Sequence, residues 1–397
     1  MLSRRLFVKS TALLGCSAAA HPLFSNMAFA DAPGDNRLVV IILRGAMDGL
    51  DVFQPYGDNN LRKLRQKLSL GPDQGALDLD GYFALHPDLG GLMPLWRAGE
   101  LAFAPAVSTP YRDKRSHFDG QDMLEAGTGT DLDLIQQRDG WLNRLLQNMP
   151  GVRSETAYSV GLEDMKILDG PAPAKSWAPQ TRFNLSAQGQ RLLEHVWHED
   201  PLFRSAGQQA IDIVESGIGT VTKEDGKEKG GPTRDVRALA RFSADRLNGA
   251  TRIATFSISG WDSHANQARV IGRALNRLSD AILTLRDGLG QNWQRTTVLA
   301  MTEFGRTVRE NGSGGTDHGT GGAMLMAGGA IRGARVYGKW PGISEQDLYS
   351  DRDLMPTQDI RAYAAWALRD LFDMPRDVLE RSVFPHLDMG ENPGFLA

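Results

Sequence analysis

The sequence has very little cysteine, and this excludes two common kinds of stabilising site. Cys16 is the only cysteine among 397 residues. A single thiol can form neither a disulfide nor a zinc-thiolate cluster within one chain. We therefore expect a fold that depends on its hydrophobic core, and the 41% hydrophobic content and the length are sufficient for a large one.

Also missing is any excess of positive charge. The chain has 44 Lys and Arg against 48 Asp and Glu, a net charge of -4 at pH 7. It has no basic run and no aromatic platform motif, so we expect no nucleic-acid partner. No glycine-rich phosphate loop or dinucleotide fingerprint follows an early strand, which argues against a nucleotide-binding protein.

The N-terminal segment predicts export. Arg4 and Arg5 precede a short apolar stretch, and the small residues "AFA" end at Ala30, which is typical of a secretory signal with a cleavage site. The segment resembles a twin-arginine signal, so we expect the twin-arginine translocation machinery as a partner and a periplasmic or secreted location. The apolar stretch is too short and interrupted for a permanent membrane span. Cys16 lies in "LLGC", which resembles a lipoprotein box, so lipid anchoring is an alternative to cleavage.

Residues 31–397 predict one α/β domain. Continuous apolar runs typical of buried parallel strands occupy residues 37–43, 100–107, 251–258, 296–302 and 323–328. Helical patterns occupy residues 86–99, 139–149, 190–199, 234–247 and 265–289. This alternation predicts a three-layer α/β sandwich with a mostly parallel central sheet. The polar segment 219–235 has few residues that could join a core, and we expect a mobile loop there.

Polar side chains are concentrated where the predicted strands end. Ligands of such folds bind beyond the carboxyl ends of the strands, in the loops that lead into the helices. The residues at these positions are Asp48; Ser116, His117 and Asp119; Asp262 and His264; Glu303 and Arg306; and, before the fifth strand, Asp317 and His318. We therefore expect five loops to meet at one edge of the sheet.

These residue types favour a metal-dependent hydrolase. Mixed Asp, Glu and His ligands suit Zn, Mn or related divalent cations, and a pair of such ions can hold the reacting oxygens of a phosphate or sulfate ester. The predicted metal ligands are Asp48, Asp262, His264, Glu303, Asp317 and His318. Ser116 is the candidate nucleophile and Arg306 the candidate clamp for the ester oxygens, with a small molecule or an envelope component as substrate.

The loop "ENGSGGTDHGTGG" is unusual, because it places one of only eight histidines among flexible residues. Glycine allows sharp turns and a close approach of the backbone to a ligand. We predict that this loop brings His318 to a cation shared with Asp262 and His264.

Several motifs together resemble an exported bacterial family of unknown function, DUF1501. They are "SRRLFVK", "LRGAMDGLDVFQPYGD", "RSHFDGQDMLEAG", "GWDSHANQ" and "TEFGRTVRENGSGGTDHG". That family is similar, more distantly, to the alkaline phosphatase and sulfatase superfamily. The resemblance implies that fold and two metals, with Asp48 near the first ligand and Ser116 near the nucleophile. This chain departs from the superfamily at Glu303, where an Asp-His dipeptide usually follows the strand, and in the D-x-H spacing of Asp262 and His264.

Structural roles compete with each functional one. Ser116 and Asp262 both precede helices and are good N-caps. His195 and His198 lie on an amphipathic helix and are more typical of a solvated face than of a metal site. Three classes of function therefore remain: a metal-dependent ester hydrolase, a catalytically silent metal-binding or cell-envelope partner protein of the same fold, and a structural domain whose acids and histidines brace loops.

Overall fold

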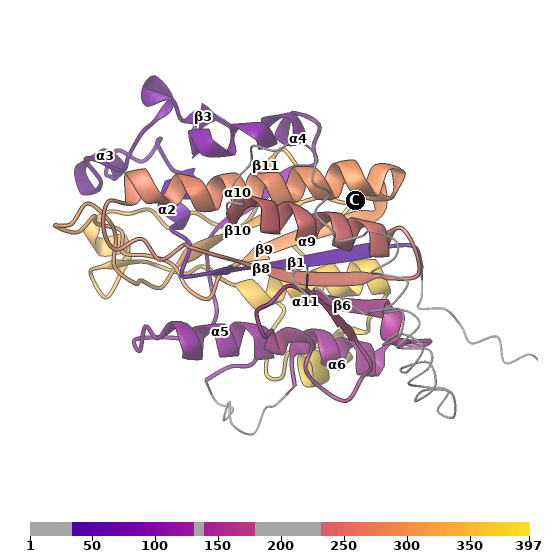
Figure 1. Ribbon diagram of the computed structural model, residues 1–397. Helices are drawn as coiled ribbons and strands as arrows, with labels where there is room; N and C mark the ends of the chain where they lie inside the picture. Colours follow the sequence, from indigo (N-terminus) through magenta and orange to yellow (C-terminus); the bar gives the residue numbers. More distant parts are fainter. Residues whose placement is uncertain (1–33, 131–138, 179–231) are drawn as a thin grey trace, which may run out of the picture.

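The computed structural model describes residues 34–130, 139–178 and 232–397 (Figure 1). The predicted signal at residues 1–30 and the predicted helix at 190–199, with His195 and His198, lie outside the described residues. So does most of the polar segment 219–235. Its last four residues belong to helix α9 (Pro232–Leu247), so the predicted loop was wrong there, since Pro is well suited to a first helical turn.

A nine-stranded sheet forms the centre of the structure. Its strands follow the order β11-β5-β10-β9-β1-β8-β6-β7, with β14 paired to β5. Their bounds are β1 Arg37–Arg44, β5 Leu101–Ser108, β6 Ala157–Val160, β7 Lys175–Trp177, β8 Ile253–Ser259, β9 Thr296–Met301, β10 Gly322–Ala327, β11 Arg335–Val336 and β14 Gln358–Asp359. Strand β10 runs antiparallel to β5 and β9, whereas the other paired strands are parallel. The prediction of a mostly parallel sheet containing five named strands is confirmed.

The position of strand β1 between two cores explains why its sequence is apolar throughout. Residues 38–43 are fully buried. Val39, Ile41 and Leu43 pack into the core that includes α9 and α10 (Gln267–Leu289). The alternate side chains pack into the core that includes α6 (Trp141–Asn148) and α11 (Ile360–Phe372). Figure 1 shows these helices on opposite sides of the sheet, which gives the predicted three layers.

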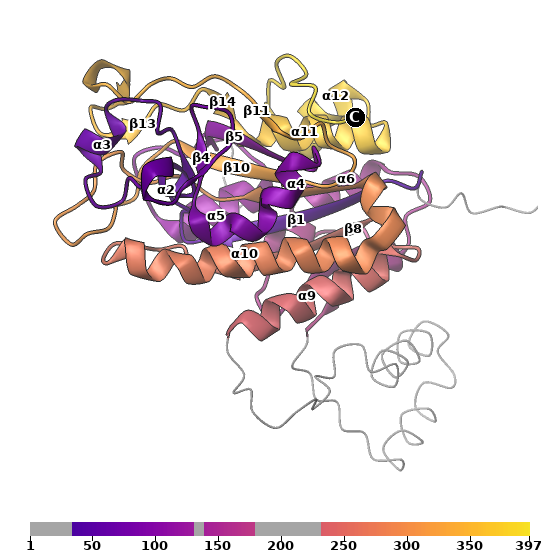
Figure 2. The same cartoon turned by 90° about the horizontal axis from the view of Figure 1, so that it is seen from above.

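The helix predictions were mostly confirmed. Helices α6, α9 and α10 occupy the predicted segments, and Figures 1 and 2 both show α9 lying beside α10. Residues 86–99 instead form a 3-10 helix (Pro87–Leu92) and a short α4 (Met93–Arg97), because two adjacent glycines weaken a continuous α-helix there. Helix α11 was not predicted, because it is buried on nearly all sides and has no distinct polar stripe.

The remaining α-helices and strands lie outside the main sheet. They are α2 Gly49–Val52, α3 Leu61–Leu64, α5 His117–Ala126, α12 Arg376–Val378, the three-stranded sheet of β2 Phe53–Gln54, β4 Ala84–Leu85 and β3 Leu77–Asp78, and the pair β12 Leu348–Tyr349 and β13 Asp353–Leu354. Among them, α5 matters most for function, because its first residue enters the site described below.

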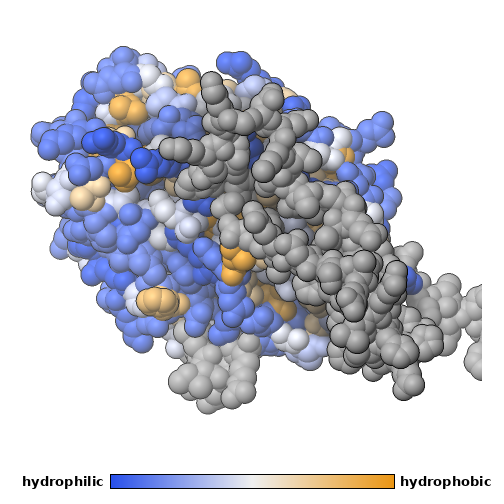
Figure 3. All heavy atoms as spheres, in the orientation of Figure 1, coloured by the Kyte–Doolittle hydropathy of each residue, from blue (hydrophilic) through white to orange (hydrophobic). Residues whose placement is uncertain are grey.

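The surface in Figure 3 is mainly hydrophilic, with small and separate apolar spots where it is not covered by grey atoms. Among the described residues, the large hydrophobic side chains with high exposure are Phe118, Leu162 and Val270. Within the same ranges, every helix is too short or too polar to cross a membrane.

The direction of β10 explains how five loops share one edge. The loops after β1, β5, β8 and β9 follow parallel strands and leave the same edge of the sheet. Asp317 and His318 precede their strand, and in a parallel strand they would lie at the opposite edge. Because β10 is antiparallel, its start lies with the carboxyl ends of the other strands.

Candidate metal centre

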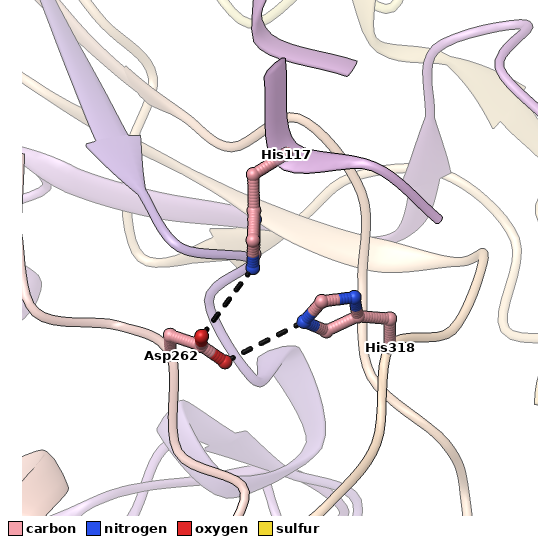
Figure 4. Close-up of side chains that lie close together, drawn as sticks. All are labelled: His117, Asp262 and His318. Carbon is pink, nitrogen blue, oxygen red and sulfur yellow. Dashed lines mark ion pairs between the residues drawn. The ribbon is translucent and has the colours of Figure 1, made fainter. Parts of the chain in front are cut away.

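Three side chains from different loops converge at this edge. His117 begins α5, Asp262 follows β8, and His318 precedes β10. One ligand atom from each lies within 4.8 Å of the others. Asp262 is central, with Oδ2 3.5 Å from His117 Nε2 and Oδ1 3.5 Å from His318 Nε2, as the dashed lines in Figure 4 show. Two ligands of one tetrahedral zinc ion lie about 3.3 Å apart, so the spacing of these atoms is compatible with a shared cation.

The imidazole of His117 is held by a buried carboxylate. Its Nδ1 lies 2.8 Å from Glu303 Oε1, and Glu303 is fully buried. Burial alone would raise the pKa of Glu303, but hydrogen bonds from His117 and its other partners lower the pKa below its ordinary value. An ionised carboxylate only accepts hydrogen bonds, so Nδ1 of His117 carries the proton.

The other nitrogen of His117 is left facing Asp262. This Nε2 atom is buried and has no hydrogen-bond partner among the described atoms. The hydrogen bond with Glu303 raises the pKa of His117, so a proton competes with a cation for Nε2. A cation that binds there takes the place of that proton.

His318 has the same arrangement with a different acceptor. Its Nδ1 lies 2.9 Å from the carbonyl oxygen of Arg115, which can only accept, so this nitrogen also carries the proton. Burial lowers the pKa of His318, which disfavours a second proton on Nε2. When both imidazoles are neutral, the Nε2 lone pair of His117 faces the Asp262 carboxylate, and Nε2 of His318 accepts a hydrogen bond from Nε2 of His264 at 2.9 Å. Arg306 offsets the charge of Asp262, so this arrangement can take a cation but does not require one.

A third histidine lies at the rim of this group. Nε2 of His264 is 3.1 Å from Asp262 Oδ1 and 2.9 Å from His318 Nε2, and its Nδ1 is 3.2 Å from Asp317 Oδ1. The contact with His318 is shorter than the spacing of two tetrahedral zinc ligands. The His264 side chain is 45% exposed, whereas that of His318 is 17% exposed. His264 is thus adjacent to the group, more open to solvent, and oriented by Asp317.

Arg306 braces the loops from a buried position. Its guanidinium is fully buried and donates to the carbonyl oxygens of Gly45, Ala46 and Thr316. It also donates to Asp262 Oδ1 at 2.6 Å. Burial would raise the pKa of Asp262, but the hydrogen bond and charge of Arg306 lower it below the ordinary value. This geometry fits a positioning residue that keeps Asp262 ionised, whereas the predicted clamp on ester oxygens stays untested.

Close backbone packing explains the glycines around His318. A Cβ atom at Gly315 would lie 2.4 Å from the Ser263 carbonyl oxygen. One at Gly319 would lie 2.4 Å from the carbonyl carbon of Arg306. Only glycine fits at these distances, so the loop can lie directly against the segments that carry Asp262 and Arg306.

Asp48 lies in a separate buried network. Its carboxylate is 1% exposed and forms an ion pair with Arg65 at 2.8 Å. Gln267 and Thr316 donate to the same Oδ2 atom, while Oδ1 accepts from the Leu50 amide as the N-cap of α2. The structure therefore places Asp48 apart from the histidines, with both oxygens already bonded. Its predicted role as a ligand stays untested.

Glu303 and Asp317 each hold a histidine side chain, and their predicted role as metal ligands stays untested. Oε1 of Glu303 accepts from the amides of Gly45 and Ala46, and Oε2 from the Thr302 hydroxyl. Asp317 accepts from Asn311 and holds His264. Such carboxylates fix the orientation of metal-binding histidines in many proteins.

Ser116 is the N-cap of α5, and its Oγ accepts from the Asp119 amide at 3.5 Å. Its neighbour His117 enters the site. The sequence places both residues after the second strand. Ser116 was predicted as the nucleophile, because serine next to a metal site is a familiar nucleophile, and His117 was not predicted as a ligand. The signal that could have identified His117 was its position at a strand end, combined with its residue type.

Comparison with known proteins gives a family and a set of distant structures. No curated protein matches this sequence. Three similar solved structures are a protein of the alkaline phosphatase superfamily from Vibrio parahaemolyticus (13% identity, 75% of this chain and 62% of that chain, TM-score 0.35), the alkaline phosphatase of the Antarctic bacterium TAB5 (10%, 74% and 91%, 0.32) and the PsFucS1 sulfatase of Pseudoalteromonas sp. (11%, 91% and 73%, 0.36).

Solved structures this distant from the chain do not show which activity it has. The sequence profile of the family described as "Protein of unknown function (DUF1501)" matches residues 97–380, which is more than half of the chain. This protein therefore belongs to the DUF1501 family.

Proposed function

We propose that this protein is an exported, metal-dependent hydrolase of phosphate or sulfate esters with one divalent cation at its centre. His117, Asp262 and His318 are the ligands. The observation that supports this most directly is the pair of Nε2 atoms that face the Asp262 carboxylate, while each Nδ1 is committed to an acceptor. A cation at this point would take the two Nε2 atoms and the carboxylate as ligands, and a partner that holds the opposite ring nitrogen, such as Glu303, is typical of metal-binding histidines.

The donor set favours Zn²⁺ over Mn²⁺. Two imidazoles and one carboxylate suit zinc, whereas manganese prefers a larger share of oxygen ligands. Three protein ligands also leave one position open, as in catalytic zinc sites. Across residues 34–130, 139–178 and 232–397, this is the one group of His, Cys, Asp or Glu side chains with such geometry. We therefore propose one cation in place of the pair implied by the resemblance.

The residues around the cation can serve ester hydrolysis. When bound, the cation supplies Lewis-acid chemistry to an ester oxygen. His264 stands beside it, half exposed and held by Asp317, where it can give a proton to a leaving oxygen. Arg306 keeps Asp262 ionised, and Glu303 holds the proton of His117 on Nδ1, so that Nε2 can bind the cation. These roles divide the site into ligands, supports and one acid-base residue.

The test compares two histidine variants with a control. Metal content of the mature protein, measured by mass spectrometry of the elements, and turnover of an aryl phosphate and an aryl sulfate are determined for each. His318→Ala is expected to lower metal affinity at least ~100-fold and to abolish turnover. His264→Ala is expected to keep the metal and lose turnover by ~100-fold or more. His386→Asn, which changes a histidine outside the site with φ of 61°, should match the wild type.

Each other result has a definite meaning. Metal loss in His264→Ala would make His264 a ligand, as the sequence predicted. Full metal occupancy without turnover of either ester in the wild type would favour a silent metal-binding protein. Equal metal content in His318→Ala and the wild type would end the proposal of a metal centre.

The proposal of export has its own test. Arg4 and Arg5 belong to the twin-arginine-like segment, so changing both to Lys should leave the precursor in the cytoplasm. A normal periplasmic yield of that double variant would contradict export by the twin-arginine machinery. The metal site would remain unaffected by that outcome.

A further inference from the structure

The site has two arginines whose guanidinium groups, unlike that of Arg306, are partly exposed. The Arg115 and Arg352 side chains are each 36% exposed, while that of Arg306 is fully buried. The sequence pointed to Arg306 for binding ester oxygens, but its donors are directed at the protein. The two exposed arginines also contact the protein, but part of each side chain is open to solvent.

Both arginines contact the same metal ligand. The carbonyl oxygen of Arg115 accepts the proton of His318 Nδ1 at 2.9 Å. Nη1 of Arg352 donates to the carbonyl oxygen of His318, also at 2.9 Å. Arg115 in addition lies two residues before His117, so it adjoins both histidine ligands.

The two positive charges share one buried carboxylate. Asp353 is fully buried and lies 2.8 Å from Arg352 Nη1 and 3.5 Å from Arg115 Nη2. It also accepts from the Thr320 hydroxyl at 2.9 Å. One buried carboxylate thus holds both guanidinium groups next to the proposed metal centre, and the charge of Arg352 also acts on Asp317.

Arg115 has two further features of a binding residue. Its Nε atom is buried and has no hydrogen-bond partner among the described atoms. Its backbone φ is 53°, a left-handed value that costs energy for a residue with a Cβ atom. Such conformations persist where the surrounding structure holds them, and they are concentrated at functional sites.

We propose that Arg115 and Arg352 form a clamp for the tetrahedral oxyanion of the substrate ester, beside the cation held by His117, Asp262 and His318. The inference rests on the proposed function, because it places the anionic part of the same substrate. Guanidinium groups bind phosphate and sulfate oxygens through paired hydrogen bonds. Arg306 acts only through Asp262 as a positioning residue.

The experiment uses the full mature protein loaded with Zn²⁺ and two probes, inorganic phosphate and inorganic sulfate. Calorimetry gives the affinity for each anion, and elemental analysis gives the metal content of the same samples. Arg115→Gln and Arg352→Gln are each expected to weaken the binding of the preferred anion about tenfold or more, with metal content unchanged. The stronger of the two wild-type affinities identifies a phosphate or a sulfate ester as the substrate class.

Two variants separate paired hydrogen bonding from simple charge attraction. Lys114→Gln removes an exposed positive charge from the same loop and should change anion affinity less than about twofold, since an exposed charge is well screened. Arg115→Lys keeps the charge and loses the fork of donors, so its affinity should fall between those of the wild type and Arg115→Gln.

The clamp and the metal centre can fail separately. Wild-type anion affinity in both glutamine variants, at normal metal content, would overturn the clamp and leave the metal centre intact. Failure of the zinc-loaded wild type to bind either anion would also overturn it. Absence of bound zinc in the wild type would overturn the proposed function, while anion affinities that still depend on Arg115 and Arg352 would support the clamp alone.

Discussion

Two polar clusters lie at the same edge of the sheet, and they differ in what their donor atoms face. The proposed metal centre contains His117, Asp262 and His318, with Nε2 atoms directed at a carboxylate. The buried carboxylate cluster contains Asp48, Asp51, Arg65, Gln267 and Thr316, in which carboxylate oxygens meet donors. Residue type and position at a strand end are shared by both clusters. The partners of each atom distinguish a binding site from a structural network.

Solvent access is the second difference. Asp262 has 47% of its side chain exposed, whereas Asp48 has 1%. Solvent reaches the first carboxylate, while the second is enclosed with its counter-ion. Gln267, at the start of α10, contacts Asp48 and the Ser263 hydroxyl, so the enclosed cluster supports the loop that carries Asp262.

The largest expected effect comes from breaking the buried ion pair. Arg65→Met leaves the Asp48 carboxylate buried without its counter-ion and should lower the free energy of unfolding by about 3–5 kcal/mol. Urea unfolding measures this change. The Asp48→Asn, Arg65→Met double variant should recover part of the loss, because no uncompensated charge remains.

The metal content of an Asp48 variant tests whether Asp48 is a ligand. Asp48→Asn should keep the wild-type metal content, because both Asp48 oxygens are bonded within the protein. If this variant lost its metal while keeping its fold, Asp48 would be a ligand after all, as the sequence predicted.

A smaller effect is expected from pH. Burial, together with the charge of Asp48, raises the pKa of Asp51 to about 7. Between about pH 4 and 7 the folded protein therefore binds a proton that the unfolded chain has released, so this contribution to stability is lost as the pH rises toward 7. Between pH 5 and 7 the loss should be on the order of 2 kcal/mol.

Comparison with Asp51→Asn isolates this contribution. Urea unfolding at pH 5, 6 and 7, with a chelator present to remove effects of metal binding, should show a steeper decline for the wild type than for the variant. Parallel profiles would mean that Asp51 titrates at an ordinary pKa.

The smallest expected effect concerns Ser116. Its hydroxyl caps α5 through a long hydrogen bond of 3.5 Å to the Asp119 amide, so Ser116→Ala should cost only about 0.5–1 kcal/mol of stability. Turnover of the better ester substrate should stay within about threefold of the wild type if the serine is only a cap. A decrease of more than ~100-fold at normal metal content would restore Ser116 as the nucleophile.

Much of the fold could be predicted because its signals are local. The run from Arg37 to Leu43 is apolar at nearly every position, which predicts a strand buried on both faces, and α10 has an apolar stripe along its length. Helix α11 gave no such signal, because it is enclosed on nearly every side. The single Cys16 already excluded a zinc-thiolate cluster within the chain.

The sequence by itself determined which kinds of side chain stand at the strand ends, since Asp262 and His318 occupy those positions whatever their partners. The tertiary structure alone decided which of them act together. The antiparallel direction of β10 brings His318 to the edge where His117 and Asp262 lie, and Arg65 encloses Asp48. These outcomes depend on contacts between residues far apart in the chain. Such contacts, and not the adjacent residues in the sequence, set the direction in which a histidine nitrogen points.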